Sequence, residues 1–277
     1  MKRISIIGAG KVGKVLGKTF SQHQVFLLQQ ILNRSIASAQ GAVDFIGAAQ
    51  AITTLDQMQA ADVYMLTVSD DQIADVCTQL AGQGLLTPDS IVFHCSGAKA
   101  STELAAALEL GAAVASVHPV CSFADVDSVV ANFSGTVCSV EGDGRALQIL
   151  IPALECIGAR VVQISAETKL LYHAGSVLAS NYLVSLLDTA LRAYQAAGIP
   201  ADVAQAMAAP LARQSLENVF SLGAAKALTG PIARGDMRTV EKQQQVVASW
   251  DADAGSLYQA FIAPTVALAA RKNYSEK

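Results

Sequence analysis

The sequence is poor in charged and aromatic residues, which make up 15% and 5% of its 277 residues. Its formal net charge is −4, and no run of Lys or Arg is long enough to follow a phosphate backbone, so we expect no nucleic-acid partner. Apolar residues make up 52% of the chain, and with so few aromatic rings the core must consist mainly of Ala, Val, Leu and Ile. This composition predicts a folded globular protein.

Cysteine motifs and membrane signals are also missing. The five cysteines are widely spaced, and none belongs to a Cys-x-x-Cys pair, so we expect reduced thiols, no disulfide framework and no metal site. A strand is predicted directly after Met1-Lys2-Arg3, which leaves no room for a cleavable signal peptide. The most apolar stretch, residues 170–197, is interrupted by polar side chains, so no bilayer-spanning segment is expected. The prediction is a cytoplasmic protein that does not contact a membrane.

The first half of the chain alternates short apolar runs with helical patterns. Continuous apolar strands separated by helices are typical of a parallel sheet that is covered on both faces. Strands are predicted at residues 4–7, 25–32, 63–68, 90–94 and 114–117, with further edge strands at 135–140 and 159–163. Helices are predicted between them at residues 11–22, 73–80, 102–110 and 146–157. This pattern predicts an α/β Rossmann fold, a doubly wound parallel sheet, over residues 1–165.

The pattern becomes helical near residue 166 and stays so to the C-terminus. Residues 167–197 are predicted as one helix of about 45 Å, at 1.5 Å per residue. Further helices are predicted at residues 201–222, 238–250 and 254–271. We therefore expect an all-α domain over residues 166–277, which would bind substrate and form a dimer.

The strongest motif is the glycine-rich turn that follows the first predicted strand, Gly8-Ala9-Gly10-Lys11-Val12-Gly13. In a Rossmann turn the first glycine permits the tight bend, the second lets the backbone approach a pyrophosphate, and the third lets helix and strand pack closely. The N-terminus of the following helix presents free N–H groups and a partial positive charge to the phosphates. A turn in this position predicts a dinucleotide site formed by all six residues.

The end of the second predicted strand bears on the choice of dinucleotide. NAD-binding chains usually place a carboxylate here to bind the ribose 2′-hydroxyl, whereas this chain has Asn33-Arg34-Ser35. Arg34 can pair with a 2′-phosphate, and Ser35 can donate a hydrogen bond to it. The alternative is that Arg34 is only a solvated surface residue. We expect NADP(H).

Several loops follow the carboxyl ends of predicted strands, where open α/β sheets bind their ligands. Val68 and Ser69 are expected to contact the nicotinamide ribose, while Asp70 is interpreted equally well as a helix cap. Ser96 and His118 each follow a further strand and are candidate catalytic residues. For both, a purely structural role that satisfies loop carbonyls is the alternative.

Two further sets of polar residues lie in the helical half. Lys169 and His173 share a face of the predicted long helix, and either could protonate a carbonyl oxygen as hydride arrives at carbon. Asn181 could orient the substrate, although Lys169 could instead be exposed in the first helical turn. Arg234, in the loop Thr229-Gly230-Pro231-Ile232-Ala233-Arg234-Gly235-Asp236, could bind a carboxylate or phosphate. Asp236 could pair with Arg234 or cap the next helix.

Taken together, these motifs resemble a family of predicted NADP-dependent oxidoreductases that join a Rossmann-like domain to a helical domain of unknown function, number 2520. The resemblance extends over nearly the whole chain and rests on the glycine turn, Asn33-Arg34-Ser35, Val68-Ser69-Asp70-Asp71-Gln72-Ile73, His94-Cys95-Ser96-Gly97, His118-Pro119, Tyr172-His173-Ala174 with Asn181, and the loop around Arg234. The family is similar to pyrroline-5-carboxylate and ketopantoate reductases of the 6-phosphogluconate-dehydrogenase-like superfamily. The resemblance implies a homodimer formed through the C-terminal helices.

This chain departs from its β-hydroxyacid dehydrogenase and ketopantoate reductase cousins at one position. Those enzymes carry a catalytic lysine followed four residues later by asparagine, whereas here His173 follows Lys169 at that spacing. The leading hypothesis is an NADP(H)-dependent reductase of a small 2-oxo or imino acid such as ketopantoate. The alternatives are a non-catalytic NADP(H)-binding regulator, and an oxidising enzyme of the prephenate dehydrogenase kind, which His118-Pro119 suggests.

Overall fold

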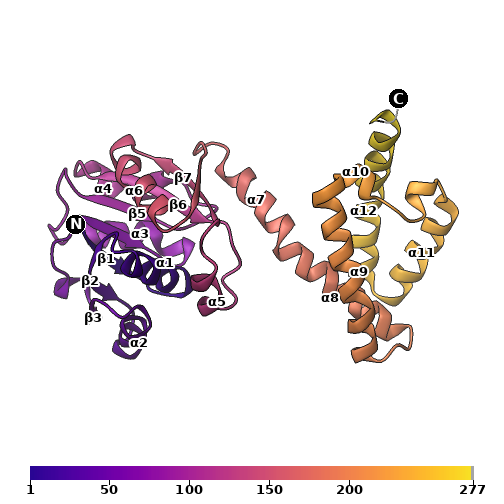
Figure 1. Cartoon of the computed structure of the whole chain (residues 1–277), viewed down its shortest axis with the longest axis horizontal. Coiled ribbons are helices and arrows are strands. Elements are labelled where there is room, and N and C mark those ends of the chain that lie inside the picture. Colours follow the sequence, from indigo (N-terminus) through magenta and orange to yellow (C-terminus); the bar gives the residue numbers. More distant parts are fainter. Residues whose placement is uncertain (276–277) are drawn as a thin grey trace. The chain divides into compact units, whose positions relative to one another are not determined.

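The computed structural model describes the backbone of residues 1–275 and the side chains through Arg271. The chain forms two compact units, Met1–Ser180 and Asn181–Lys277, and each is described by itself (Figure 1). The first unit is an α/β unit, and the second is built from helices.

The first unit contains one eight-stranded sheet in the order β3-β2-β1-β4-β5-β6-β7-β8. Its strands are β1 (Arg3–Ile7), β2 (Leu27–Leu32), β3 (Gln50–Ile52), β4 (Val63–Leu66), β5 (Ile91–His94), β6 (Ala113–Pro119), β7 (Val137–Gly142) and β8 (Arg160–Gln163). Strands β1 to β6 are mutually parallel in the doubly wound Rossmann order, which confirms the predicted fold class. Strand β7 runs antiparallel to β6, a reversal that the apolar pattern did not indicate.

Helices cover both faces of this sheet (Figure 1). They are α1 (Lys11–Gln22), α2 (Ile36–Ile46), α3 (Ile73–Ala81), α4 (Ala105–Glu109), α5 (Val126–Ala131) and α6 (Gly144–Cys156), with short 3-10 turns η1 (Leu55–Gln57), η2 (Asp70–Gln72) and η3 (Ser101–Leu104). Helix α7 (Lys169–Ala179) follows β8 and extends away from the sheet, with Lys169 as its buried residue (Figure 1). One core packs α1, α2 and α6 against the sheet, and a second core packs α3 and α4 against its other face. The sequence did not predict α2, α5 or β3. Strand β3 has only three residues, too few to show a period.

The predicted helix over residues 167–197 is interrupted. Helix α7 ends at Ser180, whose φ and ψ of −124° and −72° are not helical, and α8 (Asn181–Ala196) begins at the next residue. The compact units divide at this interruption, later than the 165/166 boundary that we expected from the sequence. Helix α7 belongs to the first unit because Lys169, at its start, is buried there.

The segment Lys169–Ala196 is the one stretch within residues 1–275 that is long and apolar enough to cross a membrane by length and composition alone. We did not expect such a stretch from the sequence. The interruption at Ser180 leaves helices of 11 and 16 residues, each shorter than the roughly 20 residues that span a bilayer.

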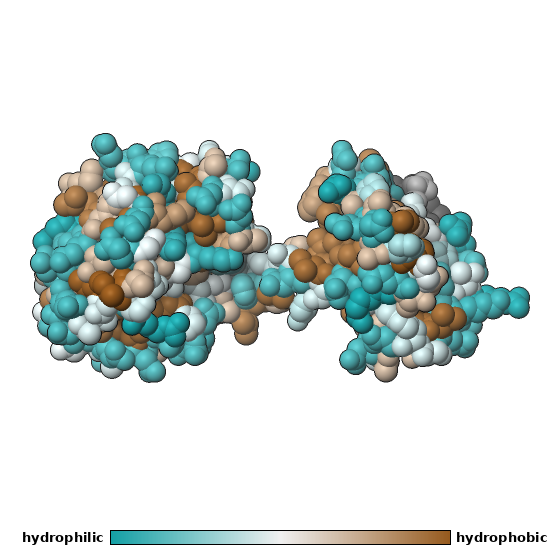
Figure 2. All heavy atoms as spheres, turned by 90° about the horizontal axis from the view of Figure 1, so that it is seen from below, coloured by the Kyte–Doolittle hydropathy of each residue, from teal (hydrophilic) through white to brown (hydrophobic). Residues whose placement is uncertain are grey.

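The second unit consists of α8, α9 (Ala201–Leu222), α10 (Ala224–Ala227), the turn η4 (Ile232–Arg234), α11 (Met237–Trp250) and α12 (Ala252–Ser275). This confirms the predicted all-α region. Within the described part of this unit, the fully buried apolar residues are Ala204, Val240 and Ala254. Many larger apolar side chains are exposed instead, and hydrophobic patches are visible on its surface in Figure 2.

Candidate functional site

The glycine turn has the geometry that its three glycines predict. Gly8 has a φ of +86°, and a Cβ there would lie 2.5 Å from Val68 Cγ1. A Cβ on Gly13 would collide with Thr67 Oγ1, so only glycine permits α1 to pack this closely on the sheet. A Cβ on Gly10 would meet no atom within 4 Å. Gly10 therefore faces open space, as the residue beside a bound pyrophosphate must.

Hydrogen bonds fix this turn to the neighbouring strands. The Gly8 N–H donates to Leu32 O at 2.8 Å, and Thr67 Oγ1 donates to Gly8 O at the same distance. The Ala9 N–H donates to Asn33 Oδ1 at 2.7 Å. Asn33 is buried, and its side-chain amide links the glycine turn to the end of β2. We predicted that Asn33 contacts the cofactor. In the structure its side chain supports the turn that would hold the cofactor.

The N-terminus of α1 is open to an anion. Its N-cap, Gly10, provides no side-chain cap, and its first turn contains no acidic residue. The first N–H groups of the helix, at Lys11, Val12 and Gly13, are the donors that a helix leaves free for phosphate. The side chain of Lys11 donates to Ala124 O at 3.0 Å, which brings a positive charge to this end of the helix.

The other predicted cofactor contacts lie on the surface. Arg34 is exposed just beyond the carboxyl end of β2, and Ser35 caps α2 by accepting a hydrogen bond from the Ser38 N–H at 3.3 Å. Val68 is half-buried and Ser69 is exposed after β4. Asp70, which we considered as a helix cap, makes no capping bond.

Three polar residues form a row across the sheet. His94 on β5 pairs in register with Ser116 on β6, which pairs with Glu141 on β7, so their side chains lie on one face. All three are buried, on the face that Leu66 shares. Polar groups removed from water in this way must find partners inside the protein.

Lys169 supplies one of those partners. Its Nζ donates to Ser116 Oγ at 2.7 Å and lies 3.6 Å from Glu141 Oε1. The residue has no exposed surface, so the alternative of a solvent-exposed Lys169 is wrong. Burial lowers the pKa of Lys169, and the nearby Glu141 carboxylate opposes that shift.

The same carboxylate also binds the loop after β5. Glu141 accepts hydrogen bonds from both the N–H and the hydroxyl of Ser101, each at 2.7 Å. In that loop the Ser96 N–H donates to His94 Nδ1 at 3.2 Å, so His94 carries its proton on Nε2, which donates to Ala100 O at 3.0 Å. Burial lowers the pKa of His94, and the neutral form fits these bonds.

A second cluster brings two histidines and a tyrosine together near the carboxyl end of β6. His118 Nδ1 lies 3.0 Å from the Tyr172 hydroxyl, and its ring meets that of His173 edge-on with centroids 5.4 Å apart. His173 Nδ1 is buried without a hydrogen-bond partner among the described residues. Burial, followed by the charges of His173 and Lys169, lowers the pKa of His118 to about 4.

Gly97 makes room for this cluster. A Cβ at Gly97 would overlap the His173 ring and lie 2.8 Å from His118 Cε1. The loop of Ser96 and Gly97 and the helix α7 therefore meet at the two imidazoles. The hydroxyl of Ser96, a candidate catalytic group, accepts the N–H groups of Ala98 and Lys99 at 3.2 and 3.0 Å and shapes this loop.

Two predicted site residues belong to the second unit. Asn181 is exposed at the start of α8, and Arg234 is exposed in η4. Asp236 caps α11, because its carboxylate accepts hydrogen bonds from the Thr239 N–H at 3.1 Å and hydroxyl at 2.6 Å. Of the two roles proposed for Asp236, the structure thus supports the cap.

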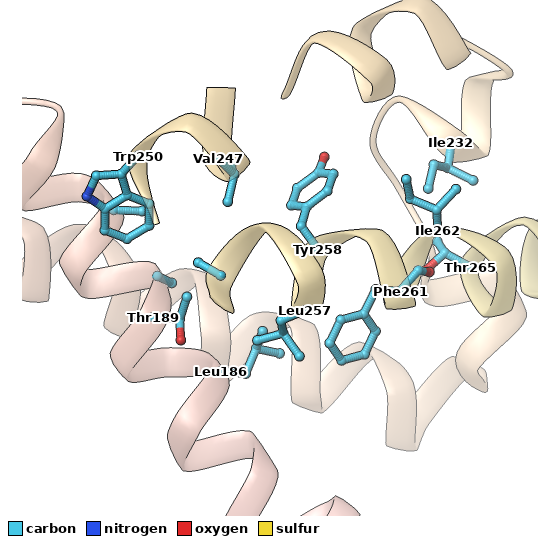
Figure 3. A pocket seen from close by; sticks show the side chains of 13 residues that line it. Leu186, Thr189, Ile232, Val247, Trp250, Leu257, Tyr258, Phe261, Ile262 and Thr265 are labelled. Atoms are coloured by element: carbon cyan, nitrogen blue, oxygen red, sulfur yellow. The ribbon is translucent and has the colours of Figure 1, made fainter. Parts of the chain in front are cut away.

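The second unit also contains an apolar cavity of about 460 Å³ (Figure 3). Figure 3 shows Leu186 from α8, Trp250 from α11, and Leu257 and Phe261 from α12 around it. The titratable group in its lining is the phenol of Tyr258, which donates to Gln243 at 2.9 Å. This lining offers little for proton or hydride chemistry. Within the described residues, no group of three His, Cys, Asp or Glu side chains could hold a metal ion.

Sequence reasoning gave no role to Ser101, Ser116, Glu141 or Tyr172. Ser116 and Glu141 are brought together by the register of neighbouring strands, and Ser101 contacts Glu141 from a loop. Neither contact can be inferred without the strand order. One signal was present: Glu141 is a charged residue inside an otherwise uncharged strand. A carboxylate in such a place requires a buried partner.

Comparison with known proteins agrees with this architecture. Residues 1–119 match the model of a Rossmann-like domain, and residues 136–264 match that of a domain of unknown function, DUF2520. These are the two kinds of domain that the resemblance of the motifs predicts. Among curated proteins, no match is found.

Three solved structures share the fold over nearly their whole length. Protein TM1727 from Thermotoga maritima is 24% identical, with a TM-score of 0.76 and 98% and 99% of the two chains covered. BF3122 from Bacteroides fragilis, a candidate NADP oxidoreductase, is 19% identical, with a TM-score of 0.78 and 96% and 98% covered. Pyrroline carboxylate reductase from Plasmodium falciparum, solved with NADP bound, is 11% identical, with a TM-score of 0.59 and 97% and 98% covered.

Proposed function

We propose that this two-domain chain is an NADP(H)-dependent oxidoreductase that reduces a small 2-oxo or imino acid, with ketopantoate as a first compound to test. One observation carries the proposal. A glycine turn with an open phosphate site at Gly10 and a histidine cluster at His118 and His173 both lie at the carboxyl ends of the parallel strands. Ligands of open α/β sheets bind at that edge.

The preference for NADP(H) rests on Arg34 and Ser35. The exposed guanidinium of Arg34 follows the strand end where NAD-binding chains place a carboxylate. Arginine pairs bidentately with phosphate, and the chain places no acidic residue at 33–35 to repel a 2′-phosphate.

Bound NADPH would supply hydride to the substrate carbon, and the protein must then manage one proton. We assign that proton to the cluster of His118, His173 and Tyr172. Burial raises the pKa of Tyr172, so its hydroxyl is protonated at pH 7 and can donate the proton that the reduced substrate takes up. His118, neutral with a pKa of about 4 and 3.0 Å from that hydroxyl, can return a proton to it from one ring nitrogen while taking one from water at the other. The substrate contacts of Asn181 and Arg234 remain part of the proposal, and Arg234→Ala should raise KM for acid substrates.

The test begins with cofactor binding. NADPH should bind more tightly than NADH, and Arg34→Ala should weaken NADPH binding about tenfold or more while leaving NADH binding nearly unchanged. The matched control is Arg160→Ala, which removes the same charge from exposed β8 at the far edge of the sheet. Tighter binding of NADH by the wild-type protein would contradict the assignment.

Turnover is tested with a panel of 2-oxo and 2-imino acids, following NADPH oxidation by absorbance. His173→Asn and His118→Asn should abolish most activity with any substrate found and leave NADPH binding intact. Tight NADPH binding without turnover of any compound would favour a non-catalytic regulator. Reduction of NADP⁺ with a hydroxy acid or a prephenate-like substrate would favour the oxidising alternative.

We further propose that the chain is cytoplasmic and forms a homodimer through its C-terminal helices. The exposed apolar side chains of α8, α9 and α12 support the dimer, since monomers rarely leave such large apolar areas in water. Light scattering should give twice the mass of the chain, and a monomeric mass would overturn this part of the proposal.

A further inference from the structure

We propose that Glu141 is a positioning residue of this site, which joins α7 and the loop 96–101 to one carboxylate and thereby holds His173 against Gly97 and beside His118. The inference rests on the proposed function only in assuming that the two histidines face the substrate. It also assigns Lys169 the role of an anchor for α7 in place of the proton donor considered above.

The first step is the burial of the ion pair. The side chains of Lys169 and Glu141 are 1% and 5% exposed, and their charged atoms are 3.6 Å apart. Ser116 Oγ and the two donors of Ser101 complete the set of partners. Removing one member of such a pair leaves an uncompensated charge in the interior, which is far more disruptive than removing both.

The second step is the geometry of α7. Lys169 is the first residue of the helix, and His173 follows one turn later at the i+4 position on the same face. Fixing the Lys169 ammonium on Ser116 and Glu141 therefore fixes where the His173 ring meets the sheet. The ring contacts Gly97 so closely that a Cβ there would overlap it, so a small movement of the helix would separate them.

The third step concerns the loop on the other side of His173. Gly97 belongs to the segment between Ser96 and Ser101, and Ser101 is bound at both its N–H and its hydroxyl by Glu141. Helix α7 and this loop meet at His173, and both are thus bound to the Glu141 carboxylate, the helix through Lys169 and the loop through Ser101. Lys169, with no exposed surface and with Nζ already bonded to Ser116, is poorly placed to reach a substrate.

The experiment compares Glu141→Gln, Lys169→Met and the double variant by hydrogen exchange and mass spectrometry. Each single variant should speed amide exchange in residues 169–179 and 95–104 by about tenfold or more, because an unpaired buried charge opens the contact. The double variant leaves no unpaired charge, so residues 95–104 should regain most of their protection. Residues 169–179 should still exchange faster than in the wild type, because α7 has lost its link to position 141. Arg3→Met and Asp62→Asn are the controls, since they break an exposed ion pair of the same unit outside both measured segments and should not change their exchange.

Kinetics separate an anchor from a proton donor. With a substrate from the screen, both single variants and the double variant should lose kcat to a similar extent while KM for NADPH stays within about twofold, because each change cuts the link from α7 to position 141. Exchange in α1 serves as the check that the fold is intact. Wild-type kcat in Glu141→Gln, with a loss only in Lys169→Met, would overturn the proposal, as would a double variant with wild-type exchange in residues 169–179.

The two proposals fail in different ways. Hydrogen exchange and NADPH binding need no turnover, so the anchoring role is decided even if the screen finds no substrate. Unchanged exchange in Glu141→Gln would remove the positioning role and leave the oxidoreductase proposal standing.

Discussion

The two units of the chain place apolar and polar groups in opposite ways. In the first unit the sheet strands are almost fully buried, and even a row of polar and charged residues, including Lys169 and Glu141, is enclosed. In the described part of the second unit the buried apolar residues are two alanines and Val240, while Phe220 is 86% exposed. One unit is closed around a core and a polar network, and the other presents apolar helical surfaces.

The difference teaches that helical periodicity alone does not tell where a side chain is buried. Apolar residues at helical spacing occur in α1 and α9 alike, yet Phe20 in α1 is 1% exposed, whereas Leu211 in α9 is 61% exposed. A sheet provides a large flat surface on which a helix buries its apolar face. Helices that pack against only a few neighbouring helices leave rows of apolar side chains exposed, and another protein surface can cover these rows.

The largest test of this contrast compares two phenylalanines. Phe93→Ala, at a side chain 1% exposed in β5, should destabilise the first unit by about 3–5 kcal/mol, because it leaves a cavity. Phe220→Ala should change the stability of the monomeric second unit by less than about 0.5 kcal/mol. Urea unfolding followed by exchange of β5 amides reports on the first unit, and fluorescence of the single tryptophan, Trp250, reports on the second. Equal losses would contradict the contrast.

Between pH 7 and pH 4.5, acid should act mainly on the first unit, because all four histidines lie there. The pKa of His118 is about 4 in the folded chain against an ordinary 6.5, so the unfolded chain binds the proton first as pH falls. The stability that is linked to the neutral form of His118 is complete above pH 6.5 and is lost towards pH 4, by at most about 3.5 kcal/mol at about 1.4 kcal/mol for each pKa unit. Urea titrations at pH 7 and pH 4.5 measure it.

In that titration, His118→Gln should flatten the pH dependence. His23→Gln, at an exposed histidine of the same unit, should leave it as in the wild type. A pH dependence that persists in His118→Gln would assign the acid sensitivity to His94, whose pKa is also lowered by burial.

Gly10→Ala should have the smallest effect on stability and a clear effect on NADPH binding. Gly10→Ala adds a methyl group that meets no protein atom, so the stability should change by less than about 1 kcal/mol. NADPH binding should weaken about tenfold or more, since the methyl group occupies the place of the pyrophosphate. Gly41→Ala, at another glycine with open space around it, is the control. Fluorescence titration with NADPH measures both, and equal affinities would place the phosphates elsewhere.

Much of the fold could be predicted because its signals are local. The apolar runs that became β1, β4, β5 and β6 are buried on both faces and need no partner to be recognised. The direction of β7 depends on how the chain returns to the sheet, and no local pattern records it. The end of α7 at Ser180 was missed for a similar reason, since no glycine or proline stands there.

The candidate site likewise has a part that could be predicted from the sequence and a part that could not. Gly8, Gly10 and Gly13 were predicted because each glycine answers a steric demand that recurs in every such turn. Glu141 and Ser101 are forty residues apart in sequence and meet only through tertiary packing. Lys169 was predicted as a candidate proton donor, but its burial depends on partners from β6 and β7, which the helix pattern cannot show.

The antiparallel pairing of β7 with β6 limits where this chain can be divided. The Rossmann-like match ends at residue 119, the last residue of β6, and the second match begins at 136, just before β7. A cut between them would leave β7 and β8 without the strand they extend, and expose the edge of β6. The two sequence families therefore meet inside one sheet, and neither match coincides with an independently foldable piece.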